Sequence, residues 1–208
     1  DYEVIFKNVK SAGSFEAWKN LCMSLRANLP LRMMMAASFA SVLLEPLKVL
    51  PFVLHVWGTT GTCKTVALMV SMSIWGDPKM GGLVKTMNMT KNAIMRNAAF
   101  LFSIPFAGDE LQTIKDKWQG NFDQLIYQIT EGVDRGRAKA YGGVEETRTW
   151  KNSFLFTGEE PITKVNSGGG SKNRVIEIAI DGPLVDDGHH VSSVVQENYG
   201  FAGRKFVE

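Results

Sequence analysis

An eight-residue segment at positions 58–65 constrains the fold of this chain more than any other feature. It reads Gly-Thr-Thr-Gly-Thr-Cys-Lys-Thr and lies between an apolar run at 52–57 and a segment of helical character at 65–75. The pattern G-x-x-x-x-G-K-[ST] between a strand and a helix is typical of a phosphate-binding loop. Only Cys63 departs from it, at a position where the pattern has glycine. We therefore expect a strand, loop and helix arranged around a phosphate site.

Each part of this loop has a predicted task. Its backbone N–H groups would face inward at the positive end of the helix dipole and form a nest for phosphate oxygens. Lys64 would reach the β- and γ-phosphates of ATP, and the hydroxyl of Thr65 would ligate Mg²⁺. We expect Cys63 to be tolerated, because a small residue at a helix start can adopt helical angles. The residues assigned to the nucleotide are Gly58, Thr59, Thr60, Gly61, Thr62, Cys63, Lys64 and Thr65.

Two other interpretations of the loop remain open. The pattern can arise by chance in a turn rich in glycine and threonine. A redox role for Cys63 is a second alternative, because a helix N-terminus lowers the pKa of a thiol. A small packing residue is the simpler interpretation of this cysteine.

Apolar runs alternate with helical segments along the rest of the chain, which is typical of a parallel sheet with crossover helices. We expect an α/β fold with a central parallel sheet flanked by helices. Residues 1–13 are expected to be extended, and the glycine-rich stretch 166–173 is expected to be a loop. Strands are predicted at 52–57, 83–89, 101–110, 153–157 and 174–180, and helices at 15–27, 31–44, 65–75, 91–99 and 122–130. Ser14 and Thr90 are predicted helix N-caps.

Composition limits the class of protein. The chain has 208 residues, 21% of them charged, and a net charge of +2, which is too small to argue for nucleic-acid binding by itself. Two cysteines make no disulfide framework, so we expect a reducing cytoplasm. The apolar stretch 33–57 is interrupted by Glu45, Pro46 and Lys48, so no membrane span is expected. The first residue is Asp rather than Met, which suggests a piece of a longer polypeptide.

An acidic pair, Asp109-Glu110, ends the predicted strand at 101–110. In this class of ATPase a carboxylate at a strand tip holds Mg²⁺ and a second one polarises the attacking water. We assign the metal to Asp109, together with Thr65, and the water to Glu110. The alternative is an acidic helix N-terminus stabilised by the dipole. The pairing favours hydrolysis over nucleotide binding alone.

Two further positions are candidates for contact with the γ-phosphate. The stretch FLFTGEE places Thr157 and then Glu159 at the tip of another predicted strand. Either side chain would position the attacking water, although an ordinary strand-to-loop transition explains the pattern equally well. Arg174 precedes the last strand and would act in the site of a neighbouring subunit. A solvated loop arginine is the alternative.

A local basic cluster lies between the predicted helix at 122–130 and the strand at 153–157. Arg135, Arg137 and Lys139, with Tyr141 beside them, would track a phosphate backbone from a hairpin. A solvated hairpin is the simpler alternative. His189 and His190 lack a metal-ligand spacing and are expected in an exposed turn.

The motifs HVWGTTGTCKT, SMSIWGDP, IPFAGDEL, FLFTGEEP and YGFAGRKF, in that order, resemble the family called domain of unknown function 927. That family is the predicted ATPase domain of phage, prophage and staphylococcal-cassette helicases and is similar to the AAA+ motor of minichromosome-maintenance helicases. The resemblance runs from about residue 31 to the C-terminus. It implies an AAA+ core at 31–208 after an N-terminal segment at 1–30, with the helical lid mostly beyond Glu208.

The resemblance also implies partners: a hexameric ring with ATP between subunits, and single-stranded DNA in the central channel near Arg137 and Lys139. The leading hypothesis is an ATP-hydrolysing helicase motor. A nucleotide-dependent assembly switch is the second, and a P-loop ATPase that acts on something other than DNA, such as a packaging or signalling ATPase, is the third. Glu110 favours the first over the second, because a switch has little need of a second carboxylate.

Overall fold

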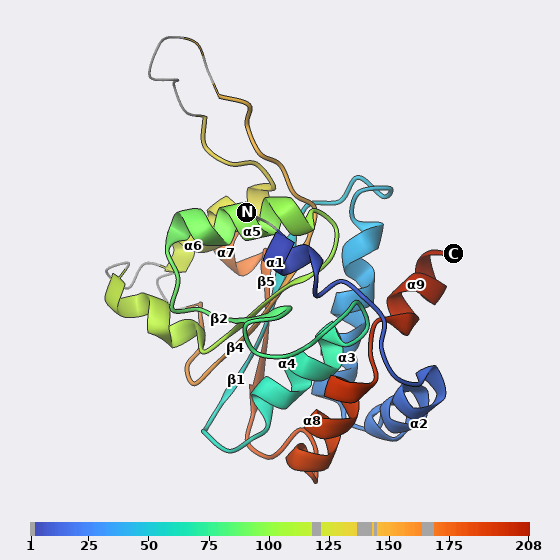
Figure 1. Cartoon of the computed structure of the whole chain (residues 1–208). Helices are drawn as coiled ribbons and strands as arrows, with labels where there is room; N and C mark the ends of the chain where they lie inside the picture. Colours follow the sequence, from blue (N-terminus) through green and yellow to red (C-terminus); the bar gives the residue numbers. More distant parts are fainter. Residues whose placement is uncertain (1–2, 118–121, 137–142, 144, 164–168) are drawn as a thin grey trace.

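Five parallel strands form one sheet in the order β2-β3-β4-β1-β5 in the computed structural model of the chain (Figure 1). The structure describes residues 3–117, 122–136, 143, 145–163 and 169–208. Within them, the strands are β1 (Phe52–Gly58), β2 (Val84–Thr86), β3 (Phe106–Asp109), β4 (Ser153–Gly158) and β5 (Val175–Ile180).

The central strand β1 explains why the sequence predicts this sheet. It pairs with β4 on one side and β5 on the other, and Val53, Leu54 and Val56 are almost completely buried. A parallel strand covered on both faces needs a continuous apolar run, which is what residues 52–57 supply. The predicted α/β fold, a parallel central sheet flanked by helices, is confirmed.

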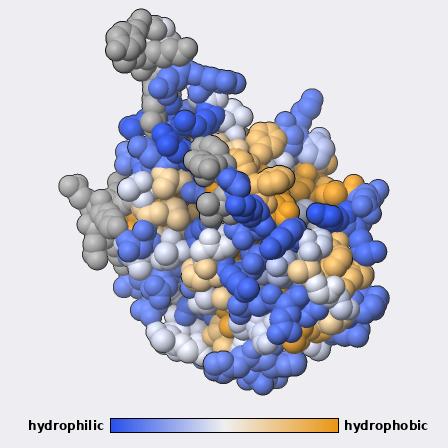
Figure 2. Space-filling view, viewed as in Figure 1, coloured by the Kyte–Doolittle hydropathy of each residue, from blue (hydrophilic) through white to orange (hydrophobic). Residues whose placement is uncertain are grey.

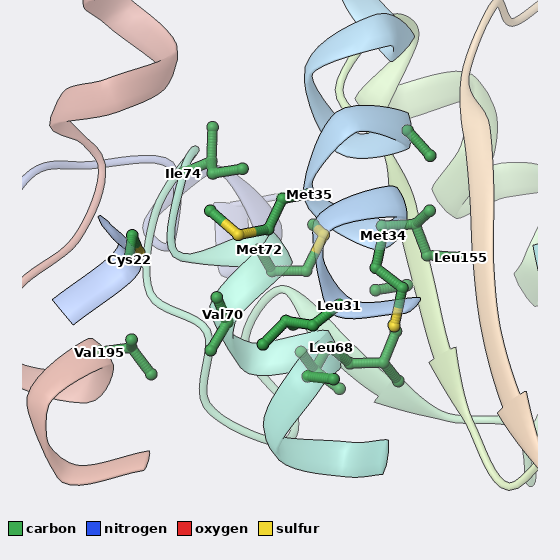
Figure 3. Close-up of a cluster of buried hydrophobic side chains, with 14 of the residues drawn as sticks. Cys22, Leu31, Met34, Met35, Leu68, Val70, Met72, Ile74, Leu155 and Val195 are labelled. Atoms are coloured by element: carbon green, nitrogen blue, oxygen red, sulfur yellow. The ribbon is translucent and has the colours of Figure 1, made fainter. Parts of the chain in front are cut away.

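One face of the sheet is covered by helices from three parts of the chain. They are α3 (Leu29–Ala40), α4 (Lys64–Met72) and α8 (Gly188–Glu197), with α2 (Phe15–Leu25) packed against α8. Figure 3 shows the resulting core, in which Leu31 and Met34 of α3 lie beside Leu68 of α4 and Leu155 of β4. This core places α4, the helix that follows the loop at 58–65, directly on the sheet.

The other face carries a second apolar core beneath α5 (Lys91–Leu101), α6 (Phe122–Glu131) and a 3-10 helix, η2 (Leu111–Lys117). The rings of Phe106, Phe154 and Phe156 pack together there. Trp150 is fully buried and its indole N–H donates to the carbonyl of Ile129 at 2.7 Å. The short helix α7 (Gly169–Lys172) lies against α6 on this side.

The predicted helix caps are confirmed. The Ser14 hydroxyl accepts from the amide of Ala17 at the start of α2, and that of Thr90 accepts from the amide of Ala93 at the start of α5. Each hydroxyl satisfies a backbone donor that the first helical turn leaves unpaired.

Three expectations for the fold are wrong. Within residues 1–13, Glu3–Phe6 form a helical turn, α1, rather than extended chain, and this turn buries Ile5. Gly169–Lys172 in the expected loop at 166–173 also form a helical turn, which packs on α6; positions 164–168 lie outside the described residues. His189 and His190 are exposed as expected, but they belong to the first turn of α8, capped by Asp187.

Several predicted elements are shorter in the structure. β2 covers only Val84–Thr86 of the run 83–89, and β3 only Phe106–Asp109 of the run 101–110, where α5 extends to Leu101. Two helices after residue 180, α8 and α9 (Phe201–Val207), complete the described chain, and a 3-10 turn, η1 (Ser41–Leu43), follows α3.

The surface is mixed, and Figure 2 shows hydrophilic residues over most of one face with an apolar area at its upper right. Exposed large apolar side chains include Leu47, Val49 and Leu50 between α3 and β1, and Phe206 and Val207 of α9. Within the described part of the chain, no helix combines the length and apolarity that crossing a membrane requires.

Candidate functional site

Three neighbouring strand tips bring the predicted site residues together. Because all strands are parallel, β1, β3 and β4 end at the same edge of the sheet, with β4 between the other two. The loop after β1 starts at Gly58, β3 ends at Asp109, and Thr157 lies near the end of β4. Ligands of open α/β sheets bind at this edge. The sheet order thus assembles residues from three distant parts of the sequence.

The loop from Gly58 to Thr65 folds back over its own lysine. Lys64 Nζ donates to the carbonyl oxygens of Gly58 at 2.9 Å and Thr59 at 2.7 Å. It also lies 3.2 Å from the hydroxyl of Thr62. These three oxygens hold the ammonium group inside the loop, at the first turn of α4. Phosphate oxygens that enter the loop would take over the same donors.

Cys63 does not have the helical angles that we expected. Its φ of 58° and ψ of 28° lie in the left-handed region, which glycine adopts without cost and other residues rarely adopt. The expectation fails because Cys63 is the N-cap residue just outside α4, where the chain turns out of the loop. Its sulfur packs toward Gly188, where an added Cβ would meet it at 3.0 Å. The glycine of the phosphate-loop pattern therefore has a conformational reason.

Asp109 connects the loop to both of the other strand tips. Its Oδ2 accepts from the Thr65 hydroxyl at 2.7 Å, and its Oδ1 accepts from the hydroxyl of Thr157. Asp109 is 7% exposed and Thr157 is completely buried. Thr157 therefore contacts the predicted metal ligand directly and orients it.

These oxygens fit a magnesium ion. Mg²⁺ is usually held by one or two protein oxygens and takes its other ligands from water and phosphate. Thr65 and Asp109 supply such a pair at the loop. No group of three His, Cys, Asp or Glu side chains that would make a complete metal site occurs among the residues that the structure describes.

A cavity of about 320 Å³ opens over the loop. Glu110 and Glu159 line it from two strand tips, and the Thr60 hydroxyl donates to Glu159 Oε1 at 2.5 Å. Glu110 is exposed and has a φ of 57°, so the chain turns sharply after β3. Its carbonyl accepts from the amide of Thr113 at 3.0 Å and begins η2. Both predicted acids thus face the space where a nucleotide would sit.

Arg174 lies at the opposite end of the strands, where they begin. It precedes β5, and its carbonyl accepts from the amide of Val53 at 3.0 Å, level with the start of β1. Its guanidinium group stacks over the Tyr127 ring at 4.8 Å and donates to the carbonyl of Gly170 at 3.2 Å. The length of strand β1, about 20 Å, lies between Arg174 and the loop at 58–65 of the same chain. Within one chain, Arg174 is not part of the site.

Of the predicted nucleic-acid residues, the structure describes Arg135, which is exposed; Arg137 and Lys139, like Tyr141, lie outside the described residues. The flanks of this segment run out from the body and are joined by an antiparallel bridge between Val133 and Thr149 (Figure 1). Arg135 lines a cavity of about 210 Å³ together with Lys91. Burial, and then the positive charge of Arg135, lower the pKa of Lys91.

Sequence reasoning missed a buried polar group behind the loop. His55 stands in the middle of β1, and its Nδ1 lies 3.2 Å from Glu177 Oε1 on β5. Burial lowers the pKa of His55, against the opposing effect of Glu177. Gln112 on η2 was also missed, although it lines the same cavity as Lys64. A histidine inside the run FVLHVW was the one available signal, because a fully buried polar residue requires a partner.

Comparisons with known proteins match one family model. Residues 1–150 match the family described as "Domain of unknown function (DUF927)". This match includes the first thirty residues and ends before β4, whereas the motif resemblance began at about residue 31. No curated protein matches the chain.

Two solved structures are similar in fold. "SCCmec type IV Cch - active helicase" has a TM-score of 0.73 and 22% identity, over 95% of this chain and 37% of that chain. The chain therefore spans little more than a third of that protein's length, and the likeness concerns the fold. JCV helicase, bound to a thiazolopyridinyl-phenoxyphenyl acetamide, has a TM-score of 0.41 and 10% identity, over 86% of this chain and 54% of that one. That second likeness is too weak to support any argument.

Proposed function

Because this chain belongs to the DUF927 family, we propose that it is the ATP-hydrolysing motor domain of a ring-forming DNA helicase from a phage or other mobile element. One observation carries the proposal: the hydroxyls of Thr65 and Thr157 both donate to Asp109, next to Lys64, at three adjacent strand tips. A chance glycine-rich turn has no reason to gather these groups. The similar fold of a protein titled an active helicase supports the same conclusion.

Each side chain has a role in the proposed reaction. Backbone N–H groups of the loop bind the phosphates, and Lys64 leaves its carbonyl partners to neutralise the β- and γ-phosphates. Thr65 and Asp109 would hold Mg²⁺, which supplies charge neutralisation on the phosphate oxygens when bound. Glu110 polarises the attacking water, and Glu159 reaches the γ-phosphate side of the cavity from β4.

Oligomerisation and DNA binding are part of the proposal. Arg174 sits too far from its own loop to act there, so a ring that brings it to a neighbouring subunit's ATP is the arrangement in which it would act. Arg135, with Arg137 and Lys139 farther along the same segment, is proposed to contact the backbone of single-stranded DNA.

The second candidate is a nucleotide-dependent assembly switch. It would need the loop, Lys64 and the metal ligands, but it would not need an acid beside them. Glu110 lines the cavity next to Asp109, which favours hydrolysis. An ATPase that moves a substrate other than DNA would have the same site and would differ only in what stimulates it.

The test is Mg²⁺-dependent ATP turnover with and without single-stranded DNA. We expect DNA to stimulate the wild type and Lys64→Ala to abolish turnover, because the principal charge on the phosphates is lost. Glu110→Gln should retain ATP but hydrolyse it at least about 10²-fold more slowly. Lys79→Ala, an exposed lysine outside the cavity, is the matched control and should behave as the wild type.

The outcomes separate the candidates. Wild-type turnover in Lys64→Ala would refute the site assignment. If the wild type binds ATP tightly without hydrolysing it, and Glu110→Gln binds ATP equally well, the assembly switch is favoured. Turnover that depends on Lys64 but ignores DNA would favour a different transported substrate.

A further inference from the structure

A buried histidine, paired with a partly buried glutamate, lies directly behind the wall of the ATP cavity. The His55 side chain is 1% exposed, and Nδ1 meets Glu177 Oε1 at 3.2 Å across the β1–β5 pair. Glu177 also accepts from the backbone amide of Ile162 at 2.6 Å and from the amide of Thr163 at 3.2 Å. The pair therefore ties β1 and β5 to the segment that follows β4, three residues beyond Glu159.

The protonation states of this pair fix the direction of its hydrogen bond. Burial lowers the pKa of His55, so the ring is neutral near pH 7. Burial would raise the pKa of Glu177, but the hydrogen bonds from His55, Thr163 and Ile162 outweigh it and hold that pKa low. Ionised Glu177 can only accept, so Nδ1 carries the proton of the neutral ring. The other ring nitrogen, Nε2, then presents a bare lone pair.

Gln112 borders the same small space as this nitrogen. His55 Nε2 and Gln112 Oε1 are both buried and have no hydrogen-bond partner among the described residues. Both atoms border the place of the missing side chain of Gly158: a Cβ there would stand 2.9 Å from Nε2 and 3.2 Å from Oε1. Two acceptors that face one small space are costly, because each lost its water on burial. A half-turn of the Gln112 amide exchanges its oxygen for its NH₂ group and supplies Nε2 with a donor.

We propose that Gln112 orients the attacking water in ATP hydrolysis, and that His55 positions Gln112 by accepting a hydrogen bond from its amide. The proposal rests on the ATPase function proposed above. In this orientation the amide oxygen of Gln112 turns toward the cavity that it lines, two positions after Glu110. A glutamine oxygen that accepts from the attacking water is a known device in phosphoryl transfer. His55 touches no substrate and is a positioning residue.

Two substitutions of His55 separate its two contacts. The amide of asparagine reaches the place of Nδ1, so His55→Asn keeps a donor for Glu177 and loses the acceptor for Gln112. The amide of glutamine reaches the place of Nε2, so His55→Gln keeps the acceptor and loses the donor. Gln112→Met removes the amide while keeping the length of the side chain.

The experiment measures kcat and KM for ATP in these variants and in the double variant His55→Asn/Gln112→Met. We expect Gln112→Met and His55→Asn each to lower kcat at least about tenfold, the effect of one lost hydrogen bond in the transition state, with KM nearly unchanged. The double variant should be no slower than either single one, and His55→Gln should recover most of the loss. If His55 had a purely structural role, His55→Asn would lower the melting temperature instead. Its effect on kcat would then add to that of Gln112→Met.

A second readout does not depend on turnover. In the presence of a non-hydrolysable ATP analogue and Mg²⁺, the ¹⁵N resonances of the His55 ring should show that Nε2 is unprotonated and hydrogen-bonded. Gln112→Met should remove the change in chemical shift that this hydrogen bond causes. A protonated Nε2, or one that is indifferent to Gln112→Met, would overturn the proposal, as would wild-type kcat in His55→Asn. If Lys64→Ala leaves turnover intact, the ATPase assignment fails separately, and the resonances still decide whether His55 and Gln112 are bonded.

Discussion

Cys63 is the residue at which the chemistry of the loop and the conformation of the backbone disagree. Its φ of 58° puts a side chain where the left-handed conformation costs a non-glycine residue about 1–2 kcal/mol. Contacts from a later part of the chain hold it there: the amide of Leu184 donates to the Thr62 carbonyl at 3.1 Å, and Gly188 lies against the sulfur. The segment before α8 thus supports the loop from outside.

We expect Cys63→Gly to leave the melting temperature unchanged or raise it slightly. Relief of the left-handed strain offsets the greater freedom that glycine gives the unfolded chain, which is worth about 0.5–1 kcal/mol. Cys22→Gly is the matched control, because Cys22 is buried inside α2 with ordinary helical geometry. It should lower stability by at least about 1 kcal/mol, measured by urea unfolding. Equal losses in the two variants would show that Cys63 is not strained.

Among single residues, the sequence predicts those that are recognised from their neighbours along the chain. Lys64 and Thr65 follow from the loop pattern, and Asp109 from an acid at the end of an apolar run. His55 and Gln112 could not be predicted in the same way, because their partners are distant: Glu177 is separated from His55 by 122 positions. The left-handed angle of Cys63 was also missed, since it depends on how the loop closes against α8.

At the scale of elements, the burial of His55 between neighbouring strands makes the pairing of β1 and β5 sensitive to acid, and the contact with Glu177 opposes this effect. Burial lowers the pKa of folded His55 below its ordinary value of about 6.5. Below that pH the unfolded chain binds a proton that the folded chain resists, so stability falls as the pH falls. Glu177, whose pKa is also lowered, adds its own loss only below its ordinary value of about 4.3.

We therefore expect the free energy of unfolding to decline from about pH 6.5 to 5, and His55→Gln to flatten that slope. Urea titrations at several pH values measure it. His190→Gln, which changes an exposed histidine in the first turn of α8, is the control and should retain the wild-type slope. An unchanged slope in His55→Gln would mean that other groups cause the acid sensitivity.

The strands and long helices were predictable for a physical reason that the short elements lack. Buried parallel strands carry continuous apolar runs, and the helices at 15–25 and 91–101 begin with side-chain caps. The helical turns α1 and α7 are four residues each, and such turns take their stability from packing rather than from their own sequence. Their positions became visible only in the folded chain.

At the scale of the molecule, the two ends of the parallel strands carry different groups. Their carboxyl ends carry the proposed ATP site, and their amino ends carry Arg174, held by Tyr127 and the carbonyl of Gly170. In a ring, the amino ends of one subunit's strands would face the ATP of the next. The guanidinium group is then already oriented before any nucleotide reaches it.

We expect Arg174→Ala to lower turnover by about 10³-fold or more with little change in ATP affinity, since such an arginine acts mainly on the transition state. Mixed with Lys64→Ala, it should recover part of the activity that neither variant has alone, because mixed sites pair an intact loop with an intact arginine. Arg96→Ala, an exposed arginine of α5, is the control and should be active without mixing. A mixture that stays inactive although mixed oligomers form would leave Arg174 a loop residue.

The bridge between Ala12 and Tyr199 can form only after both of its residues have been synthesised. Both backbone hydrogen bonds of that pair measure 3.0 Å, and the Lys10 carbonyl lies close against Gly200, so the segment around α1 and α2 is secured by residues almost two hundred positions later. A ribosome adds about 5–20 residues per second, so Ala12 waits about ten to forty seconds for its partner. During that interval the inner face of α2, with Trp18 and Cys22, has no α8 to cover it. The segment around α1 and α2 is therefore locked in place only after residues near the end of α8 have been made.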